Sequence, residues 1–224
     1  MRSLRPRFHG TALLLAAACA VTAIAQTAAT KVPADINADS KARLPYVQRK
    51  DLDEAGQKIF DVLPGRNANG TLGGPLAFAA YNPAVAKALF DLHNAAVPGS
   101  LSPHVRELAI MVACRETNYN LEWNGHEATA IRAGVDAKVI EIVRKGGPLA
   151  GLTEEDATVI RFGRQLFTDK KVDSATFAKA VQLFTRAGVM NMVAVMNTYA
   201  VSGYYAIAVD EQAAAGKTPL EPLK

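Results

Sequence analysis

The sequence predicts an all-α fold, a single compact helical domain of seven to eight helices. Three observations predict it. Apolar residues recur at intervals of three and four from Asp51 onward, helix-start and helix-stop residues punctuate that pattern, and no segment alternates convincingly with a period of two. Only the stretch VMNMVAVM is ambiguous between helix and strand. We therefore expect one helical domain built around a single apolar core.

The first expected helices lie on either side of a loop. Residues 51–63 place their apolar side chains on one face, and Pro64-Gly65 ends that pattern. The stretch GRNANGTLGGP, residues 65–75, is rich in glycine and asparagine, so we expect a loop that is a plausible rim for a site. A short helix is expected over residues 83–94, because proline suits its first turn.

The most apolar of the early helices is expected to be buried. Ser102 is a good N-cap and Pro103 suits the first helical position, and the run 108–114 that follows is wholly apolar. The next two helices are expected over residues 121–133, before a glycine, and over residues 136–145, before Gly-Gly-Pro.

Three more helices are expected in the last third of the chain. Thr153 caps one whose first turn is acidic, which suits the helix dipole. Another begins at Ser174 and ends at Gly188. The last, over about residues 190–213, is apolar on nearly all faces.

The N-terminus has the pattern of an export signal. The segment MRSLRPR carries three arginines and no acid, and an apolar run follows that ends in an A-x-A cleavage site after Ala25. This run is too short for a stable membrane span, so we expect a signal peptide over residues 1–25 and a periplasmic or secreted protein. A lipoprotein modified at Cys19 is the alternative. Residues 26–50 lack periodicity and are expected to be a flexible leader or a strap on the domain formed by residues 51–224.

Charge and cysteine content limit the possible functions. Removing residues 1–25 takes away three of the 25 basic residues and none of the 21 acids, so the net charge falls from +4 to +1. No basic patch then remains that would indicate nucleic acid. Cys114 is the only cysteine of the mature chain, so an intrachain disulfide is not possible.

The stretch RETNYNLEWNGHEATAIRAG concentrates the polar chemistry of the chain. Glu122 and His126 are four residues apart and share a helix face, so the carboxylate can hold the imidazole as an acid or base that works near neutral pH. Tyr119 lies three residues before Glu122. Glu107 lies in the preceding, apolar helix, where a buried carboxylate needs a partner. This partner could be His126, Arg106 or Arg115.

The segment LSPHVRELAIMVACRETNYNLEWNGHEATAIRAGV resembles the carboxymuconolactone decarboxylase family, which is related to the alkyl hydroperoxidase D-like proteins. The resemblance covers residues 101–143 well and continues more loosely beyond them. It implies an all-helical fold that assembles into a homo-oligomer, a trimer or hexamer, with its site near subunit contacts.

In the hydroperoxidase branch the resemblance implies a relay of a glutamate, two cysteines in C-x-x-C spacing and a histidine. The glutamate position falls at Glu107 and the histidine position at His126, but the cysteine positions fall at Tyr119 and Glu122. Peroxide reduction by that dithiol is therefore excluded. Cys114 is the alternative thiol of a peroxidase-type antioxidant protein, although a cysteine ending an apolar run is more often inert.

The decarboxylase branch implies a cofactor-free lyase acting on a small carboxylic acid or lactone. Loss of CO2 leaves an enolate-like anion, so we expect a proton donor, His126, oriented by Glu122, with Glu107 as a relay or ring-orienting partner. The expected substrate-binding residues are Arg106 and Arg115, whose guanidinium groups match a carboxylate, together with Tyr119 and Trp123.

The remaining polar and aromatic residues have alternative interpretations. Trp123 fits a core anchor as well as a substrate wall. His93 and His104 have no companion spacing and are expected to be structural or on the surface, and no metal-ligand set is complete. Of Tyr204 and Tyr205, one is expected to reach the pocket or a neighbouring subunit. A helical oligomer without catalytic activity is the third functional alternative.

Overall fold

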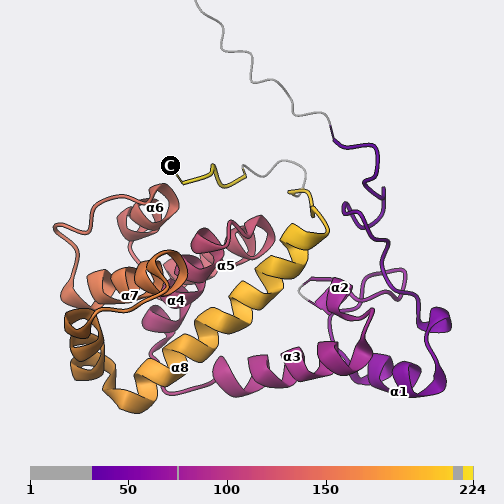
Figure 1. Cartoon of the computed structure of the whole chain (residues 1–224), viewed down its shortest axis with the longest axis horizontal. Helices are drawn as coiled ribbons and strands as arrows, with labels where there is room; N and C mark the ends of the chain where they lie inside the picture. Colours follow the sequence, from indigo (N-terminus) through magenta and orange to yellow (C-terminus); the bar gives the residue numbers. More distant parts are fainter. Residues whose placement is uncertain (1–31, 75, 214–218, 224) are drawn as a thin grey trace, which may run out of the picture. The chain divides into compact units, whose positions relative to one another are not determined.

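The computed structural model describes residues 32–74, 76–213 and 219–223 (Figure 1). From Pro33 onward these residues form one compact unit. The expected signal peptide, its cleavage site after Ala25 and the alternative lipid site at Cys19 lie outside the described residues. None of the helices in the described part of the chain is long and apolar enough to cross a membrane.

Eight α-helices make up the described part of the chain, with a short 3-10 helix at Arg49–Asp51 and a π-helical turn at Gln165–Asp169. The only β-pairing within these residues is an isolated bridge between Arg66 and Leu72. The prediction of an all-α fold with seven to eight helices is confirmed. The helices are α1 (Glu54–Val62), α2 (Leu76–Ala79), α3 (Pro83–Ala96), α4 (Pro103–Glu116), α5 (Asn120–Arg132), α6 (Ala137–Lys145), α7 (Glu154–Arg164) and α8 (Ser174–Ala208).

Side-chain caps explain where most of these helices begin. Each of six helices is preceded by a polar side chain that accepts a hydrogen bond from a free backbone N–H of the first turn. The expected caps at Ser102 and Thr153 are among them, whereas the expected cap at Ser174 is wrong, because Asp173 caps α8 and Ser174 is its first residue. The six caps are Asp53, Asn82, Ser102, Asp136, Thr153 and Asp173.

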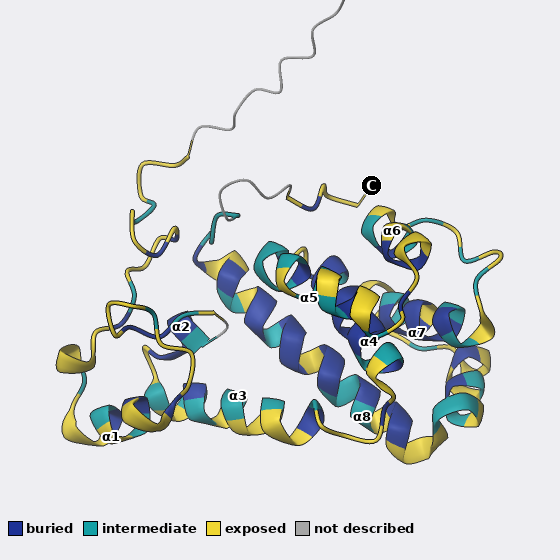
Figure 2. Ribbon diagram, turned by 180° about the vertical axis from the view of Figure 1, so that it is seen from behind, coloured by how far each residue is buried: buried dark blue, intermediate teal, exposed yellow. Residues whose placement is uncertain are grey.

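Helix α4 forms the centre of the main core, as its continuous apolar run predicts. It packs against α5, α6, α7 and α8 (Figure 1), and its residues from Leu108 to Arg115 are all buried (Figure 2). Gly163 lets α7 come close to α4, because a Cβ atom at this position would clash with Val112. The site described below is built on this rigid centre.

Helix α8 differs from the two helices that the sequence predicts. It continues through Gly188, where we expected a stop, and is interrupted instead at Thr185, whose φ of 65° and ψ of 169° are not helical. The Thr185 hydroxyl accepts a hydrogen bond from the N–H of Gly188 at 3.3 Å, so the second segment starts with its own cap. This segment ends at Ala208 rather than near residue 213.

A smaller core joins α1, α2 and α3 to the N-terminal segment. Phe60, Leu72 and Ala86 are buried there. Within residues 33–50, the N–H of Arg43 donates to the carbonyl of Val209 at 2.7 Å at the end of α8. This segment is therefore attached to the domain by backbone hydrogen bonds.

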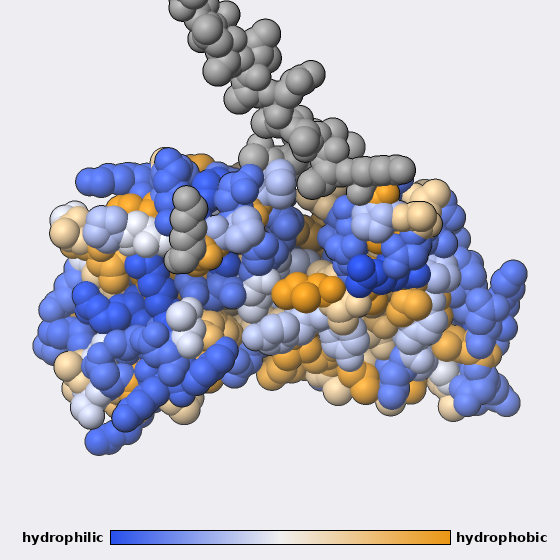
Figure 3. All heavy atoms as spheres, turned by 45° about the horizontal axis from the view of Figure 1, so that its top comes forward, coloured by the Kyte–Doolittle hydropathy of each residue, from blue (hydrophilic) through white to orange (hydrophobic). Residues whose placement is uncertain are grey.

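The surface carries both polar and apolar side chains. Hydrophilic residues cover much of the face seen in Figure 3, with apolar residues between them. Val62 and Met190 are among the large apolar side chains that are more than half exposed, at 64% and 55%. Assembly into a trimer or hexamer stays a prediction.

Candidate active site

The three acid–base residues come from two adjacent helices. Glu107 lies on α4, and Glu122 and His126 lie one turn apart on α5. A tight turn joins the helices: Asn118 has a left-handed φ of 53°, which asparagine tolerates, and the N–H of Tyr119 donates to the carbonyl of Cys114 at 2.7 Å. This turn brings α5 back along α4, so residues 19 positions apart in sequence make contact.

Both nitrogens of His126 are held by carboxylates. Its Nδ1 lies 2.8 Å from Oε2 of Glu107, and its Nε2 lies 3.3 Å from Oε2 of Glu122. Both ring nitrogens can donate to carboxylates only when the ring is an imidazolium. The edge-to-face contact with Tyr199, at a centroid distance of 5.0 Å, fixes the ring from a third side.

These contacts change the pKa values of His126 and Glu107. Burial alone would lower the pKa of His126, but the hydrogen bonds and negative charges of Glu107 and Glu122 raise it to about 9. Burial would raise the pKa of Glu107, yet the hydrogen bond and charge of His126, together with Arg106, lower it. Arg106 Nε lies 3.5 Å from Oε1 of Glu107. At neutral pH, His126 and Glu107 are therefore both ionised.

Glu122 and His126 line a cavity of about 340 Å³ that opens to the surface. Its walls come from α2, α3, α5 and α8 and from the loop after α1, so the prediction that this loop forms a rim agrees with the structure. Most of the lining is apolar. The lining residues are Pro64, Gly65, Gly73, Leu76, Leu89, Phe90, His93, Glu122, His126, Thr198, Tyr199 and Ser202.

The hydroxyl groups on α8 have a defined polarity. Thr198 donates to the carbonyl of Ala194 at 2.8 Å, and Ser202 donates to the carbonyl of Thr198 at 3.1 Å. Their protons are used, so they offer lone pairs to a ligand. The side chains of His93 and Tyr199 make no hydrogen bond within the described part of the chain, so their polar atoms are available to a ligand.

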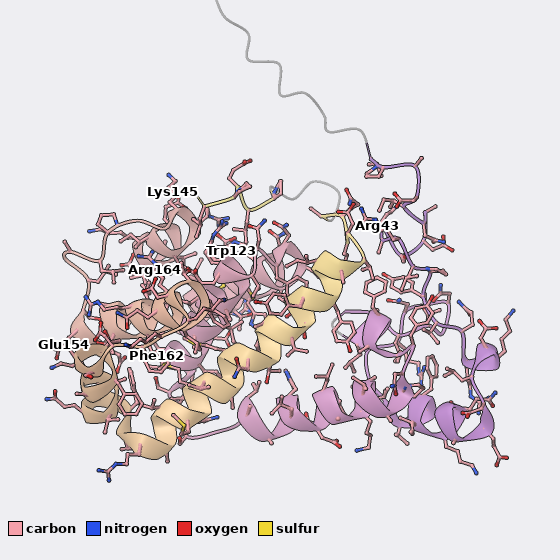
Figure 4. All side chains as sticks on the ribbon, viewed as in Figure 1. Arg43, Trp123, Lys145, Glu154, Phe162 and Arg164 are labelled. Carbon is pink, nitrogen blue, oxygen red and sulfur yellow. The ribbon has the colours of Figure 1, made fainter. Side chains whose placement is uncertain are left out.

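Two of the expected substrate-binding residues lie elsewhere. Tyr119 is 3% exposed and Trp123 is fully buried, and neither lines the cavity. Trp123 extends from α5 (Figure 4). The Cζ atom of Arg144, which lies on α6, is 4.8 Å from the centre of the Trp123 ring. Trp123 directly follows Glu122 on α5, so its side chain points about 100° away from that glutamate. Tyr119 is the N-cap residue of α5 and lies ahead of the helix.

The two expected arginines also lie outside the cavity lining. Arg115 is 2% exposed, and its Nη2 donates to the carbonyl of Glu221 in the C-terminal segment at 2.5 Å. Arg106 contacts Glu107, and neither of these two residues lines the cavity. Among the described lining residues, His126 is the only cationic group.

The structure adds lining residues that the sequence did not indicate. His93, expected to be structural or on the surface, lines the cavity from α3, and Tyr199 lines it from α8. Tyr204 is 54% exposed, and neither it nor Tyr205 lines the cavity. The one available signal for His93 was its position one turn after Leu89 on an amphipathic helix.

Cys114 is fully buried in α4. Burial, followed by the charge of Glu122, raises the pKa of its thiol, so a reactive thiolate is disfavoured. Within the described residues, no group of three or more His, Cys, Asp or Glu side chains could hold a metal ion.

Comparison with known proteins supports the resemblance seen in the sequence. Residues 83–161 match the sequence model of the "Carboxymuconolactone decarboxylase family". No curated protein matches the chain. A crystal structure described as "alkylhydroperoxidase AhpD core: uncharacterized peroxidase-related protein" from Ralstonia eutropha JMP134 is similar, with a TM-score of 0.54 and 19% sequence identity, over 78% of this chain and 93% of that one. The chain thus has the alkyl hydroperoxidase D-like fold, and its resemblance to the carboxymuconolactone decarboxylase family is confirmed by a segment that contains Glu107, Glu122 and His126.

Proposed function

We propose that this protein is an enzyme that delivers a proton from His126 to a small carbonyl compound, and that its reaction is loss of CO2 from a carboxylic acid or carboxy-lactone. One observation carries the proposal: an imidazolium held at 2.8 and 3.3 Å by two carboxylates borders an open cavity. A ring that is already protonated at neutral pH acts as an acid.

The reaction follows from where the protons lie. The bond between the substrate carbon and its carboxylate breaks, CO2 leaves, and the electron pair remains on a carbon conjugated to the carbonyl group. His126 then gives the proton on Nε2 to carbon, because Nδ1 is turned toward buried Glu107 while Nε2 lies beside Glu122 in the cavity. Water restores the proton to His126. Glu107 and Glu122 act as positioning residues.

The cavity lining suggests how the carboxylate is placed. No arginine lines the cavity among the described residues, so the departing group lies against apolar side chains such as Leu89 and Phe90. A localised carboxylate is poorly solvated there, and loss of neutral CO2 relieves that cost. We therefore assign no substrate-binding role to Arg106, Arg115, Tyr119 or Trp123.

A screen of lactones and carboxylic acids for CO2 release by the purified mature chain tests this proposal. His126→Gln should abolish release while leaving the helical circular dichroism intact. His104→Gln is the matched control, because His104 lies 2.6 Å from Asp156 and does not line the cavity. Full activity of His126→Gln would remove this residue from the mechanism.

Thiol-dependent peroxidase activity is the second candidate, favoured by the fold shared with a peroxidase-related protein. It requires Cys114 to react, although that thiol is buried. Rapid labelling of Cys114 in the folded protein, together with peroxide consumption lost in Cys114→Ser, would favour this candidate. No labelling would reject it. The third alternative, a non-catalytic helical oligomer, is less well supported because the cavity beside His126 is open.

We also propose that the protein is exported and that it assembles into a homo-oligomer. Residues 1–25 support export through their basic start and A-x-A end. Mass spectrometry of the protein from its native host should find an N-terminus at Gln26, whereas a lipidated N-terminus at Cys19 would indicate a lipoprotein. Light scattering of the mature chain tests for a trimer or hexamer.

A further inference from the structure

A second histidine faces the cavity from a different helix. His93 lies on α3, and its ring centroid is 6.2 Å from that of Tyr199, while the ring of His126 on α5 is 5.0 Å from the same tyrosine. The side chain of His93 makes no hydrogen bond to the described residues, so nothing in this part of the chain occupies its ring nitrogens. The cavity therefore places two imidazoles around one aromatic ring.

The two imidazoles have different charge states. Burial lowers the pKa of His93, the positive charge of His126 lowers it further, and the negative charge of Glu122 opposes both effects. Tyr199 on α8 is the other titratable group beside it, and burial keeps this hydroxyl protonated by raising its pKa. At neutral pH, His93 is thus neutral and His126 is charged.

We propose that His93 acts as a general base in the cavity that contains the acid His126, so that the protein also shifts protons within unsaturated lactones and similar enolisable carbonyl compounds. The inference rests on the proposed function, since it uses His126 as the same proton donor. One free base and one held acid in a single cavity suit a proton shift between two carbons, because one group can take the proton while the other delivers one.

The chemistry is balanced without any co-reactant. In α-angelica lactone, a small unsaturated lactone, His93 takes a proton from the carbon beside the carbonyl group. The electron pair spreads over the ring to the carbonyl oxygen and the far ring carbon, and His126 gives its proton to that carbon. The double bond moves into conjugation, and both histidines return to their starting states by exchanging a proton with water.

The same anion links this activity to the proposed one. Loss of CO2 from a carboxy-lactone and removal of a proton from an unsaturated lactone both leave a ring-delocalised enolate, which the charge of His126 stabilises. The cavity of about 340 Å³ has room for one five-membered ring with short substituents. It offers acceptors on Thr198 and Ser202 as well as apolar walls.

The test is isomerisation of α-angelica lactone, followed by the absorbance of the conjugated product and by deuterium incorporation in heavy water. Wild type should accelerate both above the buffer rate. His93→Gln should lower kcat by about a hundredfold, as expected for loss of a general base, with KM little changed. His104→Gln should keep the wild-type rate, because His104 is paired with Asp156 outside the cavity.

Two further measurements separate a base from a structural residue. The rate of wild type should fall at acidic pH, where His93 takes up a proton, and again above about 9, where His126 loses one. Added imidazole should restore activity to the single variant His93→Ala. It should not restore activity to the double variant that carries both His93→Ala and His126→Ala. If His93 only packs against Tyr199, neither the fall in rate at acidic pH nor the rescue by imidazole is expected.

The outcomes distinguish this inference from the proposed function. A wild-type rate in His93→Gln, or CO2 release by wild type without any isomerisation, would overturn the role of His93 alone. His93→Gln should lower isomerisation far more than CO2 release, because decarboxylation needs no base to start it. Absence of both activities in wild type would reject the proposed function and this inference together.

Discussion

Replacing Glu107 by Gln tests whether this buried carboxylate keeps His126 charged. The pKa of His126 is raised from 6.5 to about 9, which corresponds to about 3 kcal/mol in favour of the imidazolium. Burial opposes this shift, so the contacts with Glu107 and Glu122 must contribute more than the net amount. The Glu107 contact is the shorter one, 2.8 Å against 3.3 Å.

Glutamine at this position keeps the size and a hydrogen-bond partner for Nδ1 but has no charge. We therefore expect the pKa of His126 to fall by about 1–2 pH units, the range found when one close opposite charge is removed. Titration of the histidine ring signals by NMR measures it, with the His126→Gln spectrum giving the assignment. The alkaline limit of any His126-dependent activity should move to lower pH by the same amount.

Glu127→Gln is the matched control for this experiment. Glu127 follows His126 on α5, but its carboxylate pairs with Arg144 and does not contact the ring. Its removal should leave the titration of His126 close to that of wild type. An unchanged titration in Glu107→Gln would refute the assignment of Glu107 as the partner that keeps the ring charged.

The remaining predictions concern stability. Because the pKa of His126 is raised in the folded state, its contribution to folding stability is complete below about pH 6.5 and is lost as pH rises through about 9. Tm should therefore fall more across this pH range in wild type than in His126→Gln. Parallel curves of Tm against pH would contradict this. Gly163→Ala should lower the free energy of unfolding by about 1–3 kcal/mol, because its Cβ would clash with Val112. At Gly125 a Cβ atom would have no neighbour within 4 Å, so Gly125→Ala should raise the free energy of unfolding by up to about 1 kcal/mol. Urea denaturation would show whether the two substitutions change this free energy in opposite directions. Thr185→Gly should raise it by about 1 kcal/mol, since glycine adopts φ 65° and ψ 169° without strain; a lower value would mean that the lost cap outweighs the relief.

Local sequence signals were sufficient for most of the fold. The caps at Ser102 and Thr153 and the buried run in α4 depend on residues within a few positions of one another, and they appear as expected. The interruption of α8 was misplaced because Thr185, whose backbone is not helical, is neither glycine nor proline. Gly188, which the sequence suggested as a stop, sits in the first turn after that interruption.

The site divides in the same way between local and distant contacts. Glu122 and His126 share a helix face through their spacing, so the structure brings them together as expected. The sequence left three possible partners for Glu107, and only the packing of α4 on α5 selects His126. His93 and Tyr199 come from helices far away in sequence, and no spacing rule connects them to His126.

The position of Glu122 fits the proposed proton delivery better than it fits thiol chemistry. By the sequence resemblance, Tyr119 and Glu122 stand where the hydroperoxidase branch has its two cysteines. Glu122 lines the cavity and lies 3.3 Å from Nε2 of His126, whereas Tyr119 is buried away from it. A carboxylate at this place helps to hold the proton on the ring, whereas the resemblance implies a thiol here in the hydroperoxidase branch. Under the proposed function, the residue that stands at a cysteine position therefore helps Glu107 to keep His126 charged.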